Sequence, residues 1–365
     1  MPTPPPFDPP ATFNLADHLL ARRLEEGRGG RTALITDAGS WTYREVHELA
    51  SRFGHALLDA GVRPEERVLV ALPDGADFVG ALFGALRMGA VVVMVNPDQK
   101  PDGLAHVFGY TRARAVVVGL GHLEGFQAAA RQAPWAPRFL VVGEPSFDAA
   151  LGGAPTELDA FPTHRDDAAI WLFSGGTTGR PKAVVQSHAS FGNTTELYGK
   201  GVLGLGEDDR TLAVPKLYFG YATGSNLFFP FSVGASSILF PERCTAETLF
   251  GQIARHRPTL LVNVPTMINH MVGHPDAAAQ DLSSLRLATS AGEALPVELH
   301  RRWDETWGVE LLDGLGTAEM WHVFLSNRPG DVGRGTLGRV VPGFEVRLCD
   351  EDGREVPDGE PGVLR

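Results

Sequence analysis

The sequence has only two cysteines and no long hydrophobic run. Cys244 and Cys349 lie far apart and match no zinc or redox spacing, which argues against a disulfide framework and a cysteine-based metal cluster. No stretch reaches the roughly 18 apolar residues that a membrane-spanning helix needs. We therefore expect a protein of the reducing cytoplasm that does not cross a membrane.

Basic charge is also scarce. The chain has 32 Lys and Arg against 44 Asp and Glu, a net charge of -12, which opposes binding to nucleic acid or to an anionic membrane. Small molecules are the expected partners, and the oligomeric state is left open, a homodimer included. The N-terminus MPTPPPFDPP is too proline-rich and too weakly apolar for a signal peptide, so residues 1–12 are expected to be a disordered lead-in.

What the sequence does contain is a regular alternation of helical patterns with short apolar runs. Runs such as VVVMV at 91–95 and AVVVGL at 115–120 are apolar throughout, as is typical of parallel strands covered on both faces. The alternation predicts an α/β fold with two doubly wound sheet subdomains and flanking helices, over 13–165 and 166–328. Gly, Pro and Asp-Gly turns then predict the start of a small antiparallel, β-barrel-like subdomain over 329–365.

The Gly-rich stretch SGGTTGRPKAV, residues 174–184, is the strongest candidate for a binding site. It fits neither GxxxxGK followed by Ser or Thr, nor GxGxxG. Its glycines free backbone N–H groups to turn inward, and its hydroxyls and ammonium group add further donors. A flexible surface turn is the ordinary alternative. The loop's place between the strand-like runs AIWLF and AVVQ favours a rigidly held phosphate holder.

These residues resemble the adenylate-forming superfamily of acyl-CoA synthetases, adenylation domains and luciferases, whose phosphate loop is Ser/Thr/Gly-rich and ends in TGxPKG. Nearly the whole chain shares in the resemblance. Further family motifs follow in order: WTYREV at 41–46, LRMGAVVVMVNP at 86–97, SAGEALP at 290–296 and GLGTAEM at 314–320. Within the superfamily, residues 215–250 and 314–327 look most like benzoate-CoA ligases and related aryl-CoA ligases.

The resemblance implies a two-step reaction with ATP, Mg²⁺ and CoA. A carboxylate attacks the ATP α-phosphate to give an acyl-adenylate and pyrophosphate, and a thiol then attacks that anhydride. By motif position, Glu319 and Thr177 would bind Mg²⁺, and the residues assigned to catalysis are Lys182, Thr178, Glu319 and His322. The phosphates would be lined by Ser174, Gly176, Thr177, Thr178, Gly179 and Lys182, with Thr317 nearby. Adenine would lie between Gly292, Glu293 and Ala294 on one side and Asp313 and Gly314 on the other.

The same resemblance implies an aryl pocket formed by Gly220, Tyr221, Leu315 and His322, with His322 close to the carboxylate. Gly220 is smaller than the alanine associated with benzoate-preferring relatives, so we expect a benzoate with a small hydroxyl or amino substituent. Each assignment has an ordinary alternative. His322 and Tyr221 would be packed core residues, Glu319 a solvated loop carboxylate, and residues 292–294 plain turn residues.

The sequence departs from the family in two positions and at its end. Gly175 replaces a usual Ser, and Ala318 replaces the usual Thr that binds phosphate, a loss of roughly 1.5 to 3 kcal/mol for a hydrogen bond to a charged group. The chain stops before the family's ribose-binding Asp, hinge and C-terminal lid domain with its catalytic Lys. We therefore expect it to bind ATP and acid but to adenylate slowly and to transfer to thiol hardly at all.

Three functions stay open on the sequence. The first is the core of an aryl-CoA ligase, which the resemblance favours. The second is an aryl acid adenylation domain that loads a phosphopantetheinyl carrier protein. The third is a nucleotide-binding homologue without catalysis, which Gly175 and Ala318 motivate.

Overall fold

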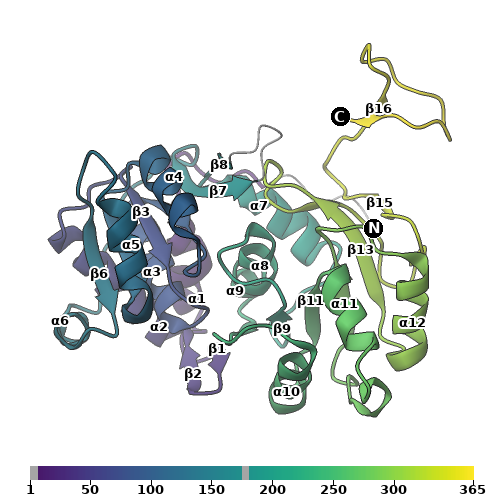
Figure 1. Cartoon of the computed structure of the whole chain (residues 1–365), viewed down its shortest axis with the longest axis horizontal. Coiled ribbons are helices and arrows are strands. Elements are labelled where there is room, and N and C mark those ends of the chain that lie inside the picture. Colours follow the sequence, from purple (N-terminus) through teal and green to yellow (C-terminus); the bar gives the residue numbers. More distant parts are fainter. Residues whose placement is uncertain (1–6, 175–180) are drawn as a thin grey trace.

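The computed structural model describes residues 7–174 and 181–365. Two large sheets lie side by side with helices around them, and Figure 1 shows the purple-to-blue part of the chain on the left and the green part on the right. The α/β fold class predicted from the alternating pattern, including a small antiparallel sheet, is confirmed.

The first sheet has six strands in the order β6-β5-β3-β4-β7-β8. Five of them are parallel, and β8 runs antiparallel to β7. As expected from their apolar runs, β4 and β5 are central, parallel and almost wholly buried. The strands are β3 (Arg67–Ala71), β4 (Val91–Met94), β5 (Ala115–Gly119), β6 (Arg138–Val142), β7 (Ala168–Ser174) and β8 (Lys182–Ser187).

The second sheet has nine strands in the order β15-β14-β13-β12-β11-β9-β10-β1-β2. Its central strands are parallel, and β2, β14 and β15 join antiparallel at the edges. The strands are β1 (Thr32–Thr36), β2 (Gly39–Thr42), β9 (Arg210–Ala213), β10 (Ser236–Ile238), β11 (Leu260–Asn263), β12 (Leu287–Ser290), β13 (Leu311–Gly316), β14 (Val323–Ser326) and β15 (Arg339–Val340).

Helices connect the strands and cover the sheets. The longest, α2, begins with a capping box in which Thr42 and Glu45 satisfy each other's backbone N–H groups, a signal of helix start that is visible in the sequence. The main helices are α2 (Tyr43–Asp59), α3 (Ala76–Arg87), α4 (Pro101–Thr111), α5 (Leu123–Ala130), α6 (Pro145–Gly153), α10 (Ala246–His256), α11 (Pro265–Val272) and α12 (Val297–Trp307). Shorter segments are η1 (Asp17–Ala21), α1 (Arg22–Glu25), η2 (Leu120–His122), α7 (Ser190–Thr194), η3 (Thr195–Lys200), α8 (Gly220–Thr223), η4 (Gly224–Phe228), α9 (Phe229–Val233) and η5 (Ala277–Ala279).

The two sheets exchange strands across residue 165. Strands β1 and β2 come from the first part of the chain but pair in the nine-stranded sheet, whereas β7 and β8 pair in the six-stranded sheet. The predicted subdomain bounds, 13–165 and 166–328, therefore stay a prediction. They divide the chain into segments, but the strands of each segment do not all pair in the same sheet.

Both ends of the described chain have defined neighbours. Of the predicted disordered lead-in over 1–12, residues 1–6 lie outside the described residues, and residues 7–12 lie against the body: the Phe7 amide donates to Asn193 Oδ1 at 3.0 Å, and Thr12 bridges to His164. Near the other end, β16 (Leu348–Cys349) and β17 (Val363–Leu364) form a separate antiparallel pair, which Figure 1 shows projecting away from the body.

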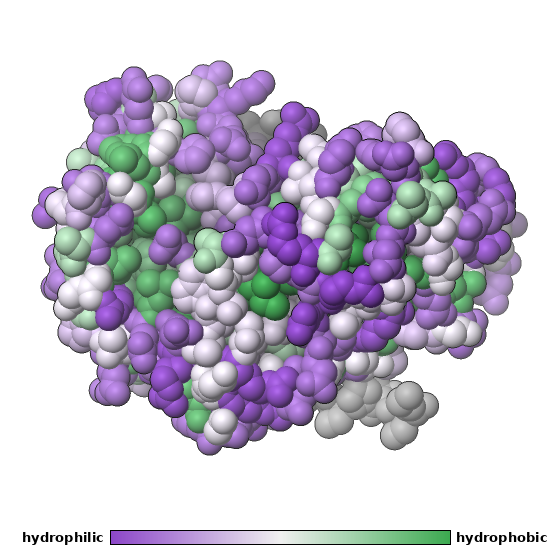
Figure 2. All heavy atoms as spheres, turned by 90° about the horizontal axis from the view of Figure 1, so that it is seen from below, coloured by the Kyte–Doolittle hydropathy of each residue, from purple (hydrophilic) through white to green (hydrophobic). Residues whose placement is uncertain are grey.

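The surface is mainly hydrophilic on the face drawn in Figure 2, and its hydrophobic patches lie mostly on the left, over the six-stranded half. In the described ranges, no helix combines the length and the apolar character needed to span a membrane.

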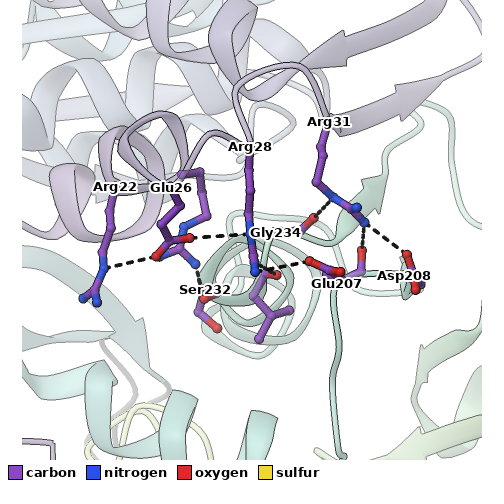
Figure 3. Close-up of polar contacts among 10 residues, drawn as sticks. Arg22, Glu26, Arg28, Arg31, Glu207, Asp208, Ser232 and Gly234 are labelled. Atoms are coloured by element: carbon purple, nitrogen blue, oxygen red, sulfur yellow. Dashed lines mark hydrogen bonds and ion pairs between the residues drawn. The ribbon is translucent and has the colours of Figure 1, made fainter.

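Three arginines of the N-terminal segment bind the C-terminal end of α9. The last carbonyl groups of a helix have no partner within it, and cations are favoured there. Arg23, Arg28 and Arg31 donate to these acceptors, with 2.7 Å for Arg28 Nη1 and 3.1 Å for Arg31 Nε. Figure 3 shows the Arg28 and Arg31 side chains extending toward this end of α9, near Ser232 and Gly234. The acceptors are the carbonyl oxygens of Ser232, Val233 and Gly234.

We predict that Arg23→Met lowers the free energy of unfolding by about 2–3 kcal/mol, because the change leaves a buried carbonyl group without its charged donor. Arg23 is only 5% exposed. The matched control is Arg22→Met, whose side chain is 58% exposed and pairs with Glu26 at 3.3 Å, and which should change stability by less than about 0.5 kcal/mol. Urea unfolding measures both, and equal losses would refute the role of Arg23.

Candidate active site

A cavity of about 850 Å³ opens between the two sheets. It lies beyond the carboxyl ends of β4 and β7, which is where open α/β sheets usually bind ligands. Helix α4, the start of α8 and the turn 317–322 complete it. Its lining residues are Met94, Val95, Asn96, Gln99, Asp102, Gly103, His106, Val107, Leu172, Phe173, Ser174, Pro181, Tyr218, Phe219, Gly220, Tyr221, Ala291, Gly292, Gly316, Thr317, Ala318, Trp321, His322 and Val323.

The start of α8 forms one wall of the cavity. A Cβ atom added at Gly220 would lie 3.1 Å from Leu172 Cδ1 and 3.8 Å from the Trp321 carbonyl oxygen, so even a methyl group at this position would press on Leu172. The Tyr221 hydroxyl is 2.7 Å from Thr289 Oγ1, which fixes its ring. Burial raises the pKa of Tyr221 well above its ordinary value, and the phenol therefore stays neutral.

His322 is a buried, neutral imidazole. Its Nε2 lies 3.0 Å from the Tyr221 carbonyl oxygen, and since that oxygen can only accept, Nε2 carries the proton. Burial lowers the pKa of His322 to about 4. The ring packs against Tyr198 and Phe229, with centroids 5.5 and 4.7 Å away. An imidazole held in this way offers ring contact but no positive charge.

The turn 317–322 has an unusual backbone. Trp321 has φ 66°, a left-handed conformation that is strained for a bulky side chain. Its ring stacks on Phe228 at a centroid distance of 5.7 Å and packs against Phe191 at 5.6 Å. Packing of the Trp321 indole therefore stabilises a left-handed backbone conformation that a tryptophan ordinarily disfavours.

Comparison with known proteins agrees with this site. The family model described as "AMP-binding enzyme" matches residues 20–365. The chain belongs to the AMP-binding enzyme family. This confirms the adenylate-forming superfamily inferred from the phosphate loop, and the relatives below are aryl-CoA ligases, as residues 215–250 and 314–327 indicate.

Three relatives of this AMP-binding enzyme chain are informative. The benzoate–CoA ligase of Thauera aromatica is 41% identical over 97% of the chain and 68% of its own length. The crystal structure of the anthranilate CoA ligase AuaEII with anthranoyl-AMP is 39% identical with a TM-score of 0.94, covering 98% of this chain and 69% of that one. A benzoate CoA ligase from Burkholderia xenovorans is 41% identical with a TM-score of 0.89, covering 96% and 71%. The chain thus spans about two thirds of these relatives.

Six of the predicted site residues of this AMP-binding enzyme chain line the single cavity described above. They were assigned from motifs in distant parts of the sequence, to phosphate, aryl and adenine binding. They are Ser174, Gly220, Tyr221, Gly292, Thr317 and His322. Gly176, Thr177, Thr178 and Gly179 lie outside the described residues.

The other predicted site residues in the described part of the chain do not line the cavity. Lys182 is exposed at the start of β8, directly opposite Ser174 of β7. Leu315 pairs with Leu325 across β13 and β14 and is half-buried. Glu293 accepts hydrogen bonds from the Thr266 amide and hydroxyl at 3.1 and 2.6 Å. Ala294 and Glu319 are exposed, and Gly314 is a buried β13 residue.

Asp313, which the family resemblance assigns to adenine binding, is buried and does not line the cavity. It is the β13 register partner of Ser290 at the end of β12, and its Oδ1 has no hydrogen-bond partner among the described residues. Burial raises the pKa of Asp313 to about 6. An unpartnered buried carboxylate oxygen is an acceptor for an N–H donor of a ligand.

Sequence reasoning missed a large part of the cavity wall. Met94 ends β4, and Val95 and Asn96 follow it within the motif LRMGAVVVMVNP. The rule that ligands bind at strand carboxyl ends could have found all three. Leu172 of β7 could have been found in the same way. Gln99 and the α4 residues Asp102 to Val107 carry no local signal, because only the folded chain brings that helix to the cavity.

We predict that His322→Gln reduces the acid sensitivity of the chain. The unfolded histidine binds a proton below its ordinary pKa of 6.5, whereas the folded one does so only near 4. Stability is therefore fully present above pH 6.5 and falls as the pH drops toward 4, by about 1.4 kcal/mol per pH unit for one such group. The variant lacks this contribution. Urea unfolding between pH 6.5 and 5 measures the two slopes, and identical slopes would contradict the assignment.

Proposed function

We propose that the chain is the core of an enzyme that uses ATP to activate a benzoate-like carboxylic acid as its acyl-adenylate, and that the thioester with CoA follows. One observation carries the proposal: residues assigned separately to phosphate, adenine and the aryl ring line a single cavity. The relatives named benzoate–CoA ligase and anthranilate CoA ligase support the same chemistry.

The described residues fit a Mg²⁺ ion that is shared with phosphates. No group of three His, Cys, Asp or Glu side chains that could hold a metal ion occurs within 7–174 and 181–365. Mg²⁺ characteristically binds through one or two carboxylates together with substrate phosphates, so Glu319 would suffice as its acidic ligand, with Thr177 as a further oxygen donor. The ion would supply neutralisation of phosphate charge.

The chain's own groups divide the work of the first step. The carboxylate oxygen of the acid forms a bond to the α-phosphorus, and the bond from that phosphorus to pyrophosphate breaks. Lys182 and the loop hydroxyls would hold the β and γ phosphates, while the Asp313 carboxylate oxygen would accept from the adenine amino group. Fixed charge at the phosphates and correct orientation of the reactants supply most of the catalysis in such transfers.

The aryl end of the cavity is suited to an uncharged ring. Tyr221 and His322 are both neutral and both fixed by hydrogen bonds, and the cavity beside Gly220 lacks one side chain. Since the His322 Nε2 proton is already donated to a carbonyl group, the prediction that His322 lies close to the substrate carboxylate stays a prediction. We propose that the ring carries a small hydroxyl or amino group.

The thiol acceptor is proposed to be CoA because the aryl-CoA ligase relatives carry that name. A phosphopantetheinyl carrier protein is the second candidate. Acceptor assays with CoA and with a loaded carrier domain distinguish the two.

We predict that aryl acids support ATP–pyrophosphate exchange with this enzyme and that long-chain fatty acids do not. A non-hydrolysable benzoyl-adenylate analogue should also bind the chain in a calorimetric titration, a measurement that requires no turnover. A clear preference for long-chain acids in exchange, together with no binding of the aryl analogue, would exclude the aryl acid assignment.

We also predict that Gly220→Ala shifts selectivity from amino- or hydroxy-substituted benzoates toward benzoate by about tenfold or more. A methyl-sized change in a pocket is worth about 1 to 3 kcal/mol, and the added Cβ would approach Leu172 Cδ1 to 3.1 Å. The control is Gly251→Ala in α10, where an added Cβ meets no atom within 4 Å. Ratios of exchange rates for the two acids measure the shift, and an unchanged ratio would remove Gly220 from the pocket.

A further inference from the structure

Gln186 is a buried polar side chain that no part of the proposed reaction uses. It lies on β8, four residues after Lys182, and is only 4% exposed. Because alternate residues of a strand point to the same face, Gln186 shares the face of Lys182, whereas Val185 points to the opposite side and is 54% exposed.

The Gln186 amide binds the turn 317–322 on the other side of the site. Its Nε2 donates to the Ala318 carbonyl oxygen at 2.6 Å and lies 3.4 Å from the Glu319 carbonyl oxygen. These are backbone oxygens of the turn that carries the Glu319 carboxylate. The contact joins β8 of the six-stranded sheet to the segment between β13 and β14 of the nine-stranded sheet.

The turn depends on such outside contacts. Within it, the Trp321 amide donates to the Ala318 carbonyl oxygen at 3.1 Å and the Met320 amide to Thr317 Oγ1 at 3.2 Å. The left-handed backbone of Trp321, φ 66°, opposes this arrangement. Indole packing supports one end of the turn, and the Gln186 amide supports the other.

We propose that Gln186 is a positioning residue that fixes the Glu319 carboxylate relative to Lys182, so that metal and phosphate ligands from two different sheets keep one geometry. The inference rests on the proposed function, in which Glu319 binds Mg²⁺ and Lys182 binds phosphate. Residues that orient metal ligands typically change metal affinity by about 10- to 100-fold when they are replaced.

The test uses two substitutions that keep the length of the side chain. Gln186→Met removes the donor without adding charge, and Gln186→Glu places a carboxylate against two carbonyl oxygens. Val185→Thr on the opposite face of β8 is the matched control. Calorimetry measures the dissociation constant of ATP with Mg²⁺ and with EDTA in its place, and thermal unfolding of each variant accompanies it.

The expected result is specific to the metal. We compare the factor by which Mg²⁺ raises the affinity for ATP, and this factor should be at least about tenfold smaller in Gln186→Met than in the wild type. The affinity for ATP without metal should change less than about twofold. The Val185→Thr control should behave as the wild type in both measurements. If Gln186→Glu does not fold, Gln186→Met decides.

Two results overturn the inference. One is that Mg²⁺ raises the ATP affinity of Gln186→Met by the same factor as that of the wild type. The other is an equal loss of affinity with and without Mg²⁺ together with a lower melting temperature, which assigns Gln186 a structural role alone. A wild-type chain that gains no ATP affinity from Mg²⁺ overturns the proposed function itself and this inference with it.

Discussion

The antiparallel pairing of Ser174 with Lys182 is the constraint on which the rest of the site depends. It holds the two ends of the Gly-rich stretch at opposite positions of one ladder, on a strand that lies next to the central β4. Both residues are therefore held by one antiparallel ladder at the edge of a sheet whose central strands are buried and parallel, although the stretch between them is rich in glycine. Phosphate binding requires such fixed donors, because electrostatic stabilisation is strongest where the donors need no reorganisation.

Glu319 and the residues proposed to bind adenine come from the other sheet, so the proposed site is complete only if the two sheets keep their relative position. Strands β1 and β2 help to join the halves, since an N-terminal segment pairs there with β10. The arginines that bind the end of α9 strengthen the same connection, because α9 directly follows α8 and η4, and α8 carries Gly220 and Tyr221. The stability of the contact between the arginines and α9 is therefore linked to the shape of the cavity wall that Gly220 and Tyr221 form.

The sequence predicted local features well and relations between distant segments poorly. Strands β4 and β5 could be recognised because runs such as VVVMV are apolar on both faces, and the strands around the Gly-rich stretch because AIWLF and AVVQ frame it. The exchange of strands between the sheets could not be predicted, since a short apolar run indicates a strand but not its neighbour. The left-handed Trp321 was equally hidden, because only packing by Phe191 and Phe228 makes that backbone tolerable.

The distribution of charge along the cavity follows from burial. At the aryl end, Tyr221 and His322 are enclosed, and burial shifts both pKa values toward the neutral forms. Lys182 and Glu319 remain exposed and lie outside the cavity lining, which includes Asp102 and His106 of α4. In the proposed function, the ring of the acid lies against the neutral Tyr221 and His322, and its carboxylate lies toward the charge of Lys182. Burial of two polar side chains then favours this orientation, because a carboxylate placed among neutral, enclosed groups would lose its hydration without gaining a charged partner.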